Sequence, residues 1–475
     1  MALSQFAPGS QTVKDKAVHT AVGVVSLKPA GGIVRAEPGL YPPLSEGNRN
    51  PIGLCEHCQA VVPLPPLSDP LPGGREPEKQ TCEVCNYSEP SLKPLDVREP
   101  KGFFTDLEPE DFDGQFEWQP RSTRPSLSIR TEDADSAQVG NCSVMNLSDR
   151  ILSVNDDGGK GGFDFHTNVK VYGVQKPGAY AVAPESPEEA GESVTTSGSS
   201  HRVALVSRRK TDILLVNIDK WPDGVFADPT TVEGRTAWYS FAFWLRIAAG
   251  YRLDVDALEL QAGFRSLPGE DDQPIGQAFL CDQLENGAGY CRLLAHEHEF
   301  AELMRLAEPT NQNGIAWEWM YSKLDPQGSQ PHGSKCDTSC NLCLRDFSNL
   351  PYHGLLDWRL ALDMARIALS PAVTVDLSSS WNGVTNPWVN LLEGEVTSVP
   401  AILRSLGYSF SERFGNLRGY RSQNRQRVLI VRHPLWTDEH PEWKAAREAA
   451  EGKYSGYEVK SANPFKVLRR PADYA

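Results

Sequence analysis

Two Cys-x2-Cys pairs near the start of the chain constrain its fold more than any other feature. They are Cys55 with Cys58 and Cys82 with Cys85, separated by a loop rich in proline and glycine. Two such turns can place four thiolates around a zinc ion, each about 2.3 Å from the metal. We therefore predict a zinc ribbon, which as a closed site would be structural rather than catalytic. The alternatives are two unrelated pairs or a redox motif, but neither pair lies between a strand and a helix as thioredoxin-like chemistry requires.

A second cysteine cluster lies in the C-terminal half. Cys340 and Cys343 form a third Cys-x2-Cys pair, and Cys336 adds a third sulfur, one ligand short of a tetrahedral zinc site. We expect Cys291 to complete this second site. Reduced structural cysteines are an alternative, and so is a catalytic thiol, although a thiol nucleophile needs an identifiable histidine partner. The other candidate fourth ligands in the preceding stretch are Cys281, His296, His298 and His332.

The overall charge argues against a chain that attracts DNA over its whole surface. Asp and Glu number 62 against 47 Lys and Arg, which gives a net charge of −15. A DNA contact must therefore come from a local basic surface or from a partner. No stretch approaches the roughly 20 apolar residues that span a bilayer, and the N-terminus lacks the apolar core of a signal peptide. We expect a cytoplasmic protein with no membrane partner, where cysteine clusters more often bind metal than form disulfides.

An arginine-rich strip, Arg404–Arg432, is the most basic part of this acidic chain. It contains one acidic residue, Glu412, and aromatic residues are interleaved with the arginines. Guanidinium groups pair with phosphates and aromatic rings stack on bases, so the strip is our candidate for DNA contact. The alternative is a basic face that is solvated or that docks an acidic partner. The expected DNA-binding arginines are Arg404, Arg413, Arg418, Arg421, Arg425 and Arg427.

A glycine-containing turn joins a predicted strand to a predicted helix in "FLCDQLENGAGYC" (279–291). The strand ends in Asp282, and the turn contains Gly287 and Gly289. Backbone amides at the start of the helix could receive a DNA phosphate, so we include both glycines among the DNA-binding candidates. The alternative is that the glycines only permit a tight turn.

The sequence pattern changes near Ala237, from short strands to longer helical segments. A helix is expected from about His353 to Leu369, where apolar residues recur at spacings of three and four. These patterns predict an α+β, multi-domain protein with a β-rich N-terminal half and a mixed α/β C-terminal zinc-binding module. The expected segments are an N-terminal β segment (1–50), the zinc ribbon with an acidic linker (51–125), a β-rich domain (126–230), the zinc-binding module (231–370) and a C-terminal α/β region with the arginine-rich strip (371–475).

Two segments of the chain resemble a known module. They are the glycine-turn segment and "CDTSCNLCLRDFSNLPYHGLLDWRLAL" (336–362). Both are similar to the zinc-binding domain at the C-terminus of MrfA-type superfamily-two DNA helicases, and most of all to its stand-alone DrmB-like form in DISARM anti-phage systems. "HPLW" (433–436) fits the same branch, and the resemblance covers about residues 235–440. One departure is Ser334, which stands where the helicase-borne domains tend to carry a further cysteine.

The resemblance implies a zinc scaffold without catalytic residues that binds DNA and a superfamily-two helicase or ATPase subunit. The motor would be a separate partner, since the chain has no GxxxxGK[ST] motif. The implied role is anti-phage defence. One alternative is a nuclease or other hydrolase of the same pathway, with Asp282, Glu285 and Asp357 as the available acids. Another is an assembly factor for a DNA-repair helicase that does not touch DNA.

Overall fold

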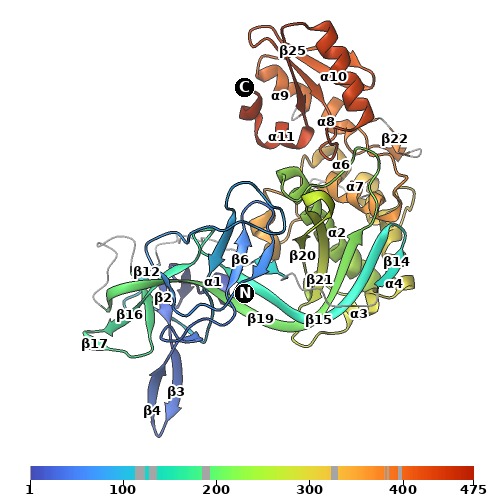
Figure 1. The fold of residues 1–475 in the computed structure, drawn as a ribbon. Coiled ribbons are helices and arrows are strands. Elements are labelled where there is room, and N and C mark those ends of the chain that lie inside the picture. Colours follow the sequence, from blue (N-terminus) through green and yellow to red (C-terminus); the bar gives the residue numbers. More distant parts are fainter. Residues whose placement is uncertain are drawn as a thin grey trace. The chain divides into compact units, whose positions relative to one another are not determined.

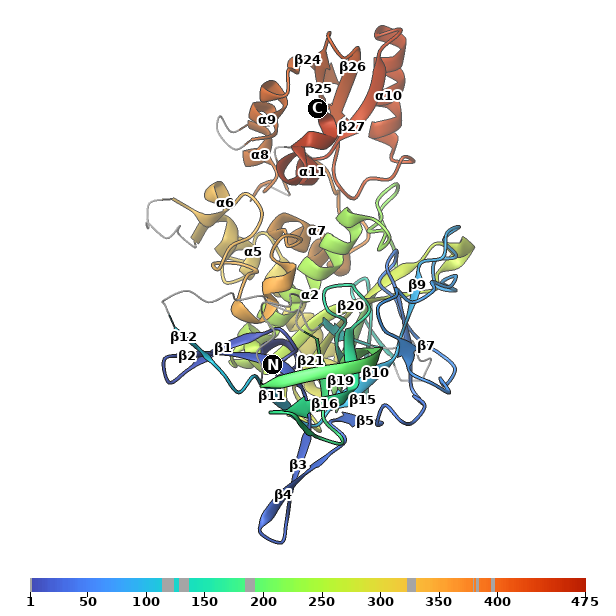
Figure 2. The same ribbon diagram turned by 90° about the vertical axis from the view of Figure 1, so that its left-hand side faces the viewer.

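The computed structural model describes residues 2–112, 124–127, 136–183, 193–322, 330–378, 380–381, 384–393 and 398–475. Part of the predicted acidic linker, residues 113–123, lies outside the described residues. The chain forms two compact units (Figures 1 and 2). Unit 1 comprises Met1–Glu132, Ser148–Thr211 and Arg265–Pro274, and unit 2 comprises Asp133–Leu147, Asp212–Phe264 and Ile275–Ala475.

Unit 1 is built around a sheet with the strand order β1-β2-β18-β16-β19-β10-β5. Along this path β10 and β19 run parallel, and the other neighbours run antiparallel. In β16, the buried residues Phe163 and Phe165 alternate with less buried ones, and they lie opposite Val203 and His201 of β19. Side chains on one face of this sheet therefore form the core. The strands are β1 (Gln11–Lys14), β2 (Ala17–Val24), β18 (Tyr180–Val182), β16 (Phe163–Val171), β19 (Val194–Ile218), β10 (Val97–Pro100) and β5 (Leu40–Tyr41).

Two smaller sheets belong to the same unit. Strands β6 (Ile52–Cys55), β7 (Val61–Pro63) and β9 (Leu92–Leu95) pair antiparallel and carry the first cysteine cluster. Strands β3 (Ser26–Ala30) and β4 (Ile33–Glu37) form a hairpin that extends away from the main sheet of the unit (Figure 1).

The core of unit 2 is a long buried helix, α2 (Val232–Leu253), which packs against α7 (Trp358–Leu369) and β21 (Ile275–Asp282). The Thr231 side chain caps the start of α2 by accepting from the Gly234 amide, and Asp254 ends the helix in the left-handed conformation. Strand β21 pairs with β20 (Leu260–Leu267), and it pairs antiparallel with the end of β19. Two short helices follow the sheet, α3 (Tyr290–Leu294) and α4 (Glu297–Met304).

The helix predicted from about His353 begins later, at Trp358, and ends at Leu369 as expected. It starts there because the Asp357 side chain accepts from the Arg359 amide at 3.1 Å and caps the first turn. The preceding residues, Phe347–Tyr352, form a separate 3-10 helix that contains Pro351.

The end of the chain forms a four-stranded sheet in the order β24-β25-β26-β27. Its last two strands are parallel, and the other pairs are antiparallel. Apolar residues on one face, such as Val428 and Ile430, belong to a core with α10, whereas Leu429 and Val431 face a core with α9 and α11. The elements are α8 (Val389–Glu393), α9 (Val399–Ser405), β24 (Ser409–Phe414), β25 (Leu417–Ser422), β26 (Arg427–Val431), α10 (Pro441–Lys453), β27 (Glu458–Ala462) and α11 (Pro464–Arg469).

The predicted fold class is confirmed. The N-terminal half is rich in strands, the C-terminal half contains the longer helices, and each half carries a group of side chains that could hold a metal ion. Among the described residues, no helix is long and apolar enough to cross a membrane.

Candidate metal centres and nucleic-acid surface

The first candidate metal centre is formed by two turns with the same local geometry. Cys55 ends β6, and the chain turns through Cys58 so that the Gln59 amide donates to the Cys55 carbonyl at 3.0 Å. In the second turn the Asn86 amide donates to the Cys82 carbonyl at 2.9 Å. Gln59 and Asn86 both have positive φ, 64° and 42°. Each turn therefore directs its two sulfurs toward the other turn.

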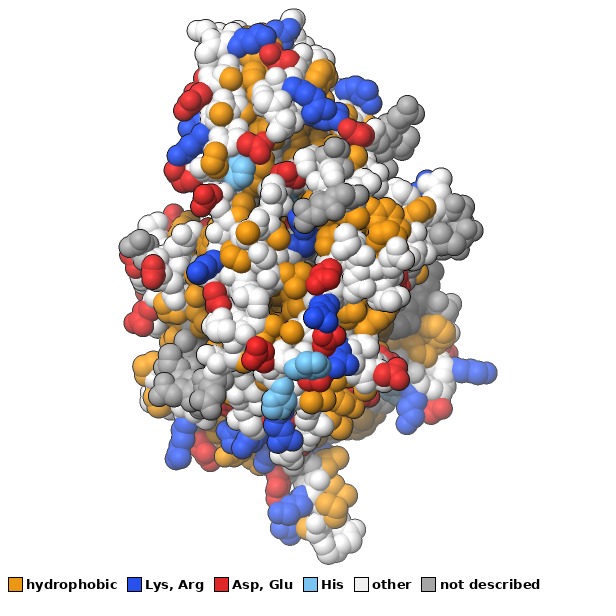
Figure 3. All heavy atoms as spheres, turned by 90° about the vertical axis from the view of Figure 1, so that its right-hand side faces the viewer, with side chains coloured by type: hydrophobic (Ala, Val, Ile, Leu, Met, Phe, Trp, Pro, Cys, Tyr) orange, Lys and Arg blue, Asp and Glu red, His pale blue; other side chains and the backbone are white. Residues whose placement is uncertain are grey.

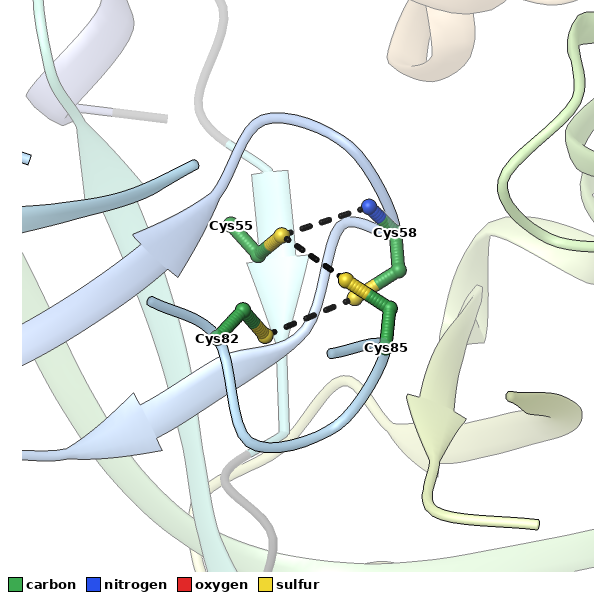
Figure 4. A group of neighbouring side chains, drawn as sticks. All are labelled: Cys55, Cys58, Cys82 and Cys85. Carbon is green, nitrogen blue, oxygen red and sulfur yellow. Dashed lines mark hydrogen bonds between the residues drawn. The ribbon is translucent and has the colours of Figure 1, made fainter. Parts of the chain in front are cut away.

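The four sulfur atoms lie close together and face one another, as Figure 4 shows. Cys55 Sγ lies 3.8 Å from Cys85 Sγ, and Cys58 Sγ lies 3.9 Å from Cys82 Sγ. A tetrahedron of sulfurs about 2.3 Å from zinc has edges of about 3.8 Å, whereas a disulfide brings two sulfurs to about 2.05 Å. All six separations are within 4.8 Å. This spacing fits a metal site with four cysteine ligands.

The burial and close spacing of these four thiols also bear on which ion they could hold. All four residues are buried. Hydrogen bonding with the Cys55 and Cys82 thiols raises the pKa of Cys58 above the ordinary thiol range, and burial adds to the rise. A bound divalent cation would allow all four to be thiolates. The residues present therefore fit zinc.

The second candidate centre joins His332 with Cys336, Cys340 and Cys343, whose ligand atoms all lie within 4.8 Å of one another. His332 begins the short helix α6 (His332–Lys335), and Cys336 follows it, so the two residues are one helical turn apart. Cys340 and Cys343 form the adjoining turn, in which the Cys340 amide donates to Cys343 Sγ at 3.1 Å. The donor set is one imidazole and three thiolates, a combination typical of structural zinc.

The His332 ring is oriented as a metal ligand requires. Its Nδ1 lies 3.1 Å from the carbonyl oxygen of Trp319, to which Nδ1–H can donate. Nε2 is buried and makes no hydrogen bond with any residue that the structure describes. In zinc-binding histidines, one ring nitrogen usually donates to a carbonyl or carboxylate, and the other nitrogen binds the metal.

Cys291, the expected fourth ligand, is not brought to this group. It lies on α3, where its backbone amide donates to Asp282 Oδ1 at 2.9 Å. Burial raises the pKa of the Cys291 thiol well above its usual range, and the carboxylate of Asp282 adds to that rise. His332, one of the other candidates that the sequence offered, occupies the fourth position. The spacing of four residues between His332 and Cys336, one helical turn, is a sequence signal that could have identified His332.

The second centre is anchored to the start of α7. Trp358 donates its backbone amide to the Thr338 carbonyl at 2.9 Å and its indole N–H to the Cys336 carbonyl at 3.0 Å. Arg359 donates to the Asp337 carbonyl at 2.8 Å. The cysteine loop and the long helix are therefore one structural unit.

The backbone amides of the Gly287–Gly289 turn, at the start of α3, already have a hydrogen-bond acceptor and are not free for a phosphate. The amides of Ala288, Gly289 and Tyr290 donate to Asp282 Oδ2 at 2.7, 2.7 and 3.1 Å. A carboxylate of the chain itself thus occupies the position predicted for a phosphate. Both glycines have positive φ, 77° and 87°, which explains their presence in a tight turn.

The arginine-rich strip forms much of the C-terminal sheet and is not one continuous surface. Arg418 pairs with Glu393 at 2.7 Å, and Arg427 pairs with Glu458 at 2.8 Å. The guanidinium of Arg421 lies 5.5 Å from the centre of the Tyr454 ring on the α10 side. On the face drawn in Figure 3, basic and acidic side chains are interspersed.

The remaining arginines of the strip are more exposed. Arg404 lies near the end of α9, Arg413 on β24, and Arg425 in the turn before β26. Arg425 donates to the Leu406 carbonyl at 2.8 Å. DNA contact by the strip stays a prediction, with Arg404, Arg413 and Arg425 the most accessible members.

Two of the three acids of the hydrolase alternative, Asp282 and Asp357, make structural contacts within the fold. Asp282 accepts four backbone amides, and the fully buried Asp357 caps α7 and pairs with Arg469 at 3.3 Å. Among the described residues, the two groups able to hold a metal contain cysteine and histidine and no carboxylate.

Comparison with known proteins finds a curated relative that is much longer than this chain. No protein-family model matches this chain. Druantia protein DruE of Escherichia coli (strain UMEA 4076-1) is 26% identical over 394 residues, which cover 78% of this chain and 19% of DruE. The chain thus spans about a fifth of the length of that relative. Among solved structures, the DUF1998 helicase MrfA bound to DNA matches 57% of this chain and 29% of that chain, at 9% identity and a TM-score of 0.30.

Proposed function

We propose that this chain is a non-catalytic, zinc-stabilised accessory subunit of a DNA helicase complex in anti-phage defence. The observation that carries the proposal is the match to Druantia protein DruE, which extends over most of this chain but covers a small part of DruE. The motor would come from outside these 475 residues, which contain no GxxxxGK[ST] motif.

Zinc would act in both centres as a structural cofactor. The ribbon cysteines would hold two turns of unit 1 together, and the His332 centre would hold the cysteine loop against α7. The free energy of metal binding at such sites is folding free energy, because the unfolded chain has no preformed site. No reaction step requires either metal.

DNA contact would come from the arginine-rich strip. Its exposed arginines can neutralise phosphates locally on a chain whose net charge is −15. DNA binding should therefore be weak, strongly dependent on salt, and reinforced by the partner motor.

Phage challenge tests the proposal. Cells that carry the chain in its native locus would be compared with cells that carry an in-frame deletion of it, by efficiency of plating. We expect the deletion to abolish protection, and a Cys82→Ser, His332→Ala variant to behave like the deletion. Equal plating on deletion and intact strains, for phages that the intact locus restricts, would contradict the proposal.

A further inference from the structure

A pocket lies beside the arginine-rich strip, between α8, β24 and β25 in the C-terminal part of unit 2. Its volume is about 290 Å³, just below the ~300–1,000 Å³ typical of small-molecule sites. The floor is apolar, and the rim carries two arginines, one glutamate and two uncharged polar side chains. The lining residues are Leu377, Ser378, Val389, Leu392, Glu393, Arg413, Asn416, Leu417, Arg418 and Val431.

The two arginines of the rim stand directly opposite each other on neighbouring strands. Arg413 of β24 and Arg418 of β25 are cross-strand partners, so their side chains leave the same face of the sheet. Like charges in this position destabilise a sheet. Glu393 compensates Arg418, whereas Arg413 makes no ion pair with a described residue and donates to the Asn416 carbonyl at 3.3 Å. An anion between the two guanidinium groups would remove the repulsion.

A third arginine reinforces the positive potential. Burial raises the pKa of Tyr420, and Arg418, Arg404 and Arg413 oppose that rise. Three guanidinium groups thus act on one buried phenol of β25, the strand that also carries Arg418, and Arg404 is exposed at the end of α9. Among the described residues that line the pocket, two arginines stand against one acid, Glu393.

We propose that this pocket binds one nucleotide unit of a DNA strand, with the phosphate on Arg413 and Arg418 and the base against the apolar floor. The inference rests on the proposed DNA contact and specifies its substrate. A base is free to enter such a pocket only when it is unpaired and unstacked, so the site would select single-stranded over duplex DNA. The volume suits one nucleotide unit and is too small for a dinucleotide cofactor.

Fluorescence anisotropy of a labelled oligothymidylate on the full chain tests this assignment. An Arg413→Ala, Arg418→Ala variant should weaken binding by about tenfold or more, because two charge-assisted hydrogen bonds are lost. Asn416→Trp, at an exposed turn on the rim, should weaken binding about fivefold by blocking the mouth while charge is unchanged. The matched control is Lys444→Ala, Arg447→Ala on α10, which removes two positive charges from the other side of the sheet.

Loss of affinity in both pocket variants with near wild-type binding in the control would support the proposal. If the pocket and control double variants weaken binding equally, and Asn416→Trp binds as the wild type does, the pocket is not the binding site. The proposed DNA contact would then be a diffuse electrostatic one. Absence of DNA binding by the wild-type chain would instead remove the proposed DNA contact itself. Thymidine 5′-monophosphate that binds as tightly as the oligonucleotide would show that the pocket takes a free nucleotide, which also overturns the assignment to a DNA strand.

Discussion

His433 Nε2 lies 2.9 Å from Asp363 Oδ2, and neither side chain is exposed. The Leu435 amide donates to His433 Nδ1 at 3.2 Å, so Nε2 carries the proton that is shared with Asp363. The indole of Trp388 donates to the same carboxylate oxygen at 2.8 Å. Because Asp363 lies on α7 and His433 follows β26, this pair connects the long helix to the C-terminal sheet.

Replacement of His433 by leucine should destabilise the folded protein severely. The substitution leaves the buried Asp363 carboxylate without its main partner, and breaking such a pair costs about 3–5 kcal/mol. Chemical denaturation followed by tryptophan fluorescence measures the change. His298→Leu, at a side chain that is 78% exposed, is the control and should change stability little. A loss of only about 0.5 kcal/mol for His433→Leu would show that the pair contributes little.

Removal of the His332 imidazole should release one of two zinc ions. We expect about two zinc ions per wild-type chain and about one for His332→Ala, because a structural site with three ligands binds zinc far more weakly. Cys291→Ser should retain about two, since Cys291 contacts Asp282 and lies outside the candidate centre. Elemental analysis of the purified chains gives the count. Loss of zinc in Cys291→Ser with retention in His332→Ala would reverse the assignment.

Sequence spacing located both cysteine clusters, because a Cys-x2-Cys turn brings its own sulfurs together whatever surrounds it. It did not decide the fourth ligand of the second cluster. Cys291 and His332 were both possible in sequence, and the choice depends on the tertiary position of α3 relative to α6. The same applies to the DNA-contact candidate at Gly287 and Gly289. The sequence pattern predicts the turn, but whether its backbone amides can bind a phosphate depends on the orientation of the Asp282 side chain.

Other contacts cannot be predicted from a local pattern. Asp363 and His433 are 70 residues apart, and although His433 begins the HPLW segment, neither position indicates that the two side chains meet. The pocket beside Arg413 likewise depends on α8, β24 and β25 meeting in space. Closely spaced arginines predicted a basic strip, but the register of the strands decides which arginines pair with acids and which remain exposed.

Asp282→Asn should lower stability without changing DNA affinity. The carboxylate accepts four backbone amides around the glycine turn, and an amide group would present a donor to some of them, which costs about 1–3 kcal/mol. Thermal unfolding and oligonucleotide binding below the transition measure the two effects. Glu285→Gln, at an exposed position in the same turn, is the control. A magnesium-dependent DNA cleavage activity lost in Asp282→Asn would favour the hydrolase alternative instead.

His440 provides a pH-sensitive contact in the C-terminal part of unit 2. Its ring stacks on that of Trp436, with centroids 3.6 Å apart and an interplanar angle of 8°. Burial lowers the pKa of His440 from 6.5 to about 4, and the neighbouring His433 and Arg432 add to this effect while Asp376 opposes it. The ring is therefore neutral in the folded protein at pH values where it would be protonated in the unfolded chain.

The sign of the pH dependence follows from this difference. Because the folded-state pKa of His440 is lower than the unfolded value, the unfolded chain binds more protons between pH 6.5 and about 4, and stability falls as the pH falls through that window. His440 is partly exposed, so we expect this residue to contribute about 1 kcal/mol or less. His440→Phe preserves the stack on Trp436 but cannot titrate, and should show a shallower loss of stability between those pH values in urea denaturation. An identical pH profile for both proteins would show that protonation of His440 is not coupled to unfolding.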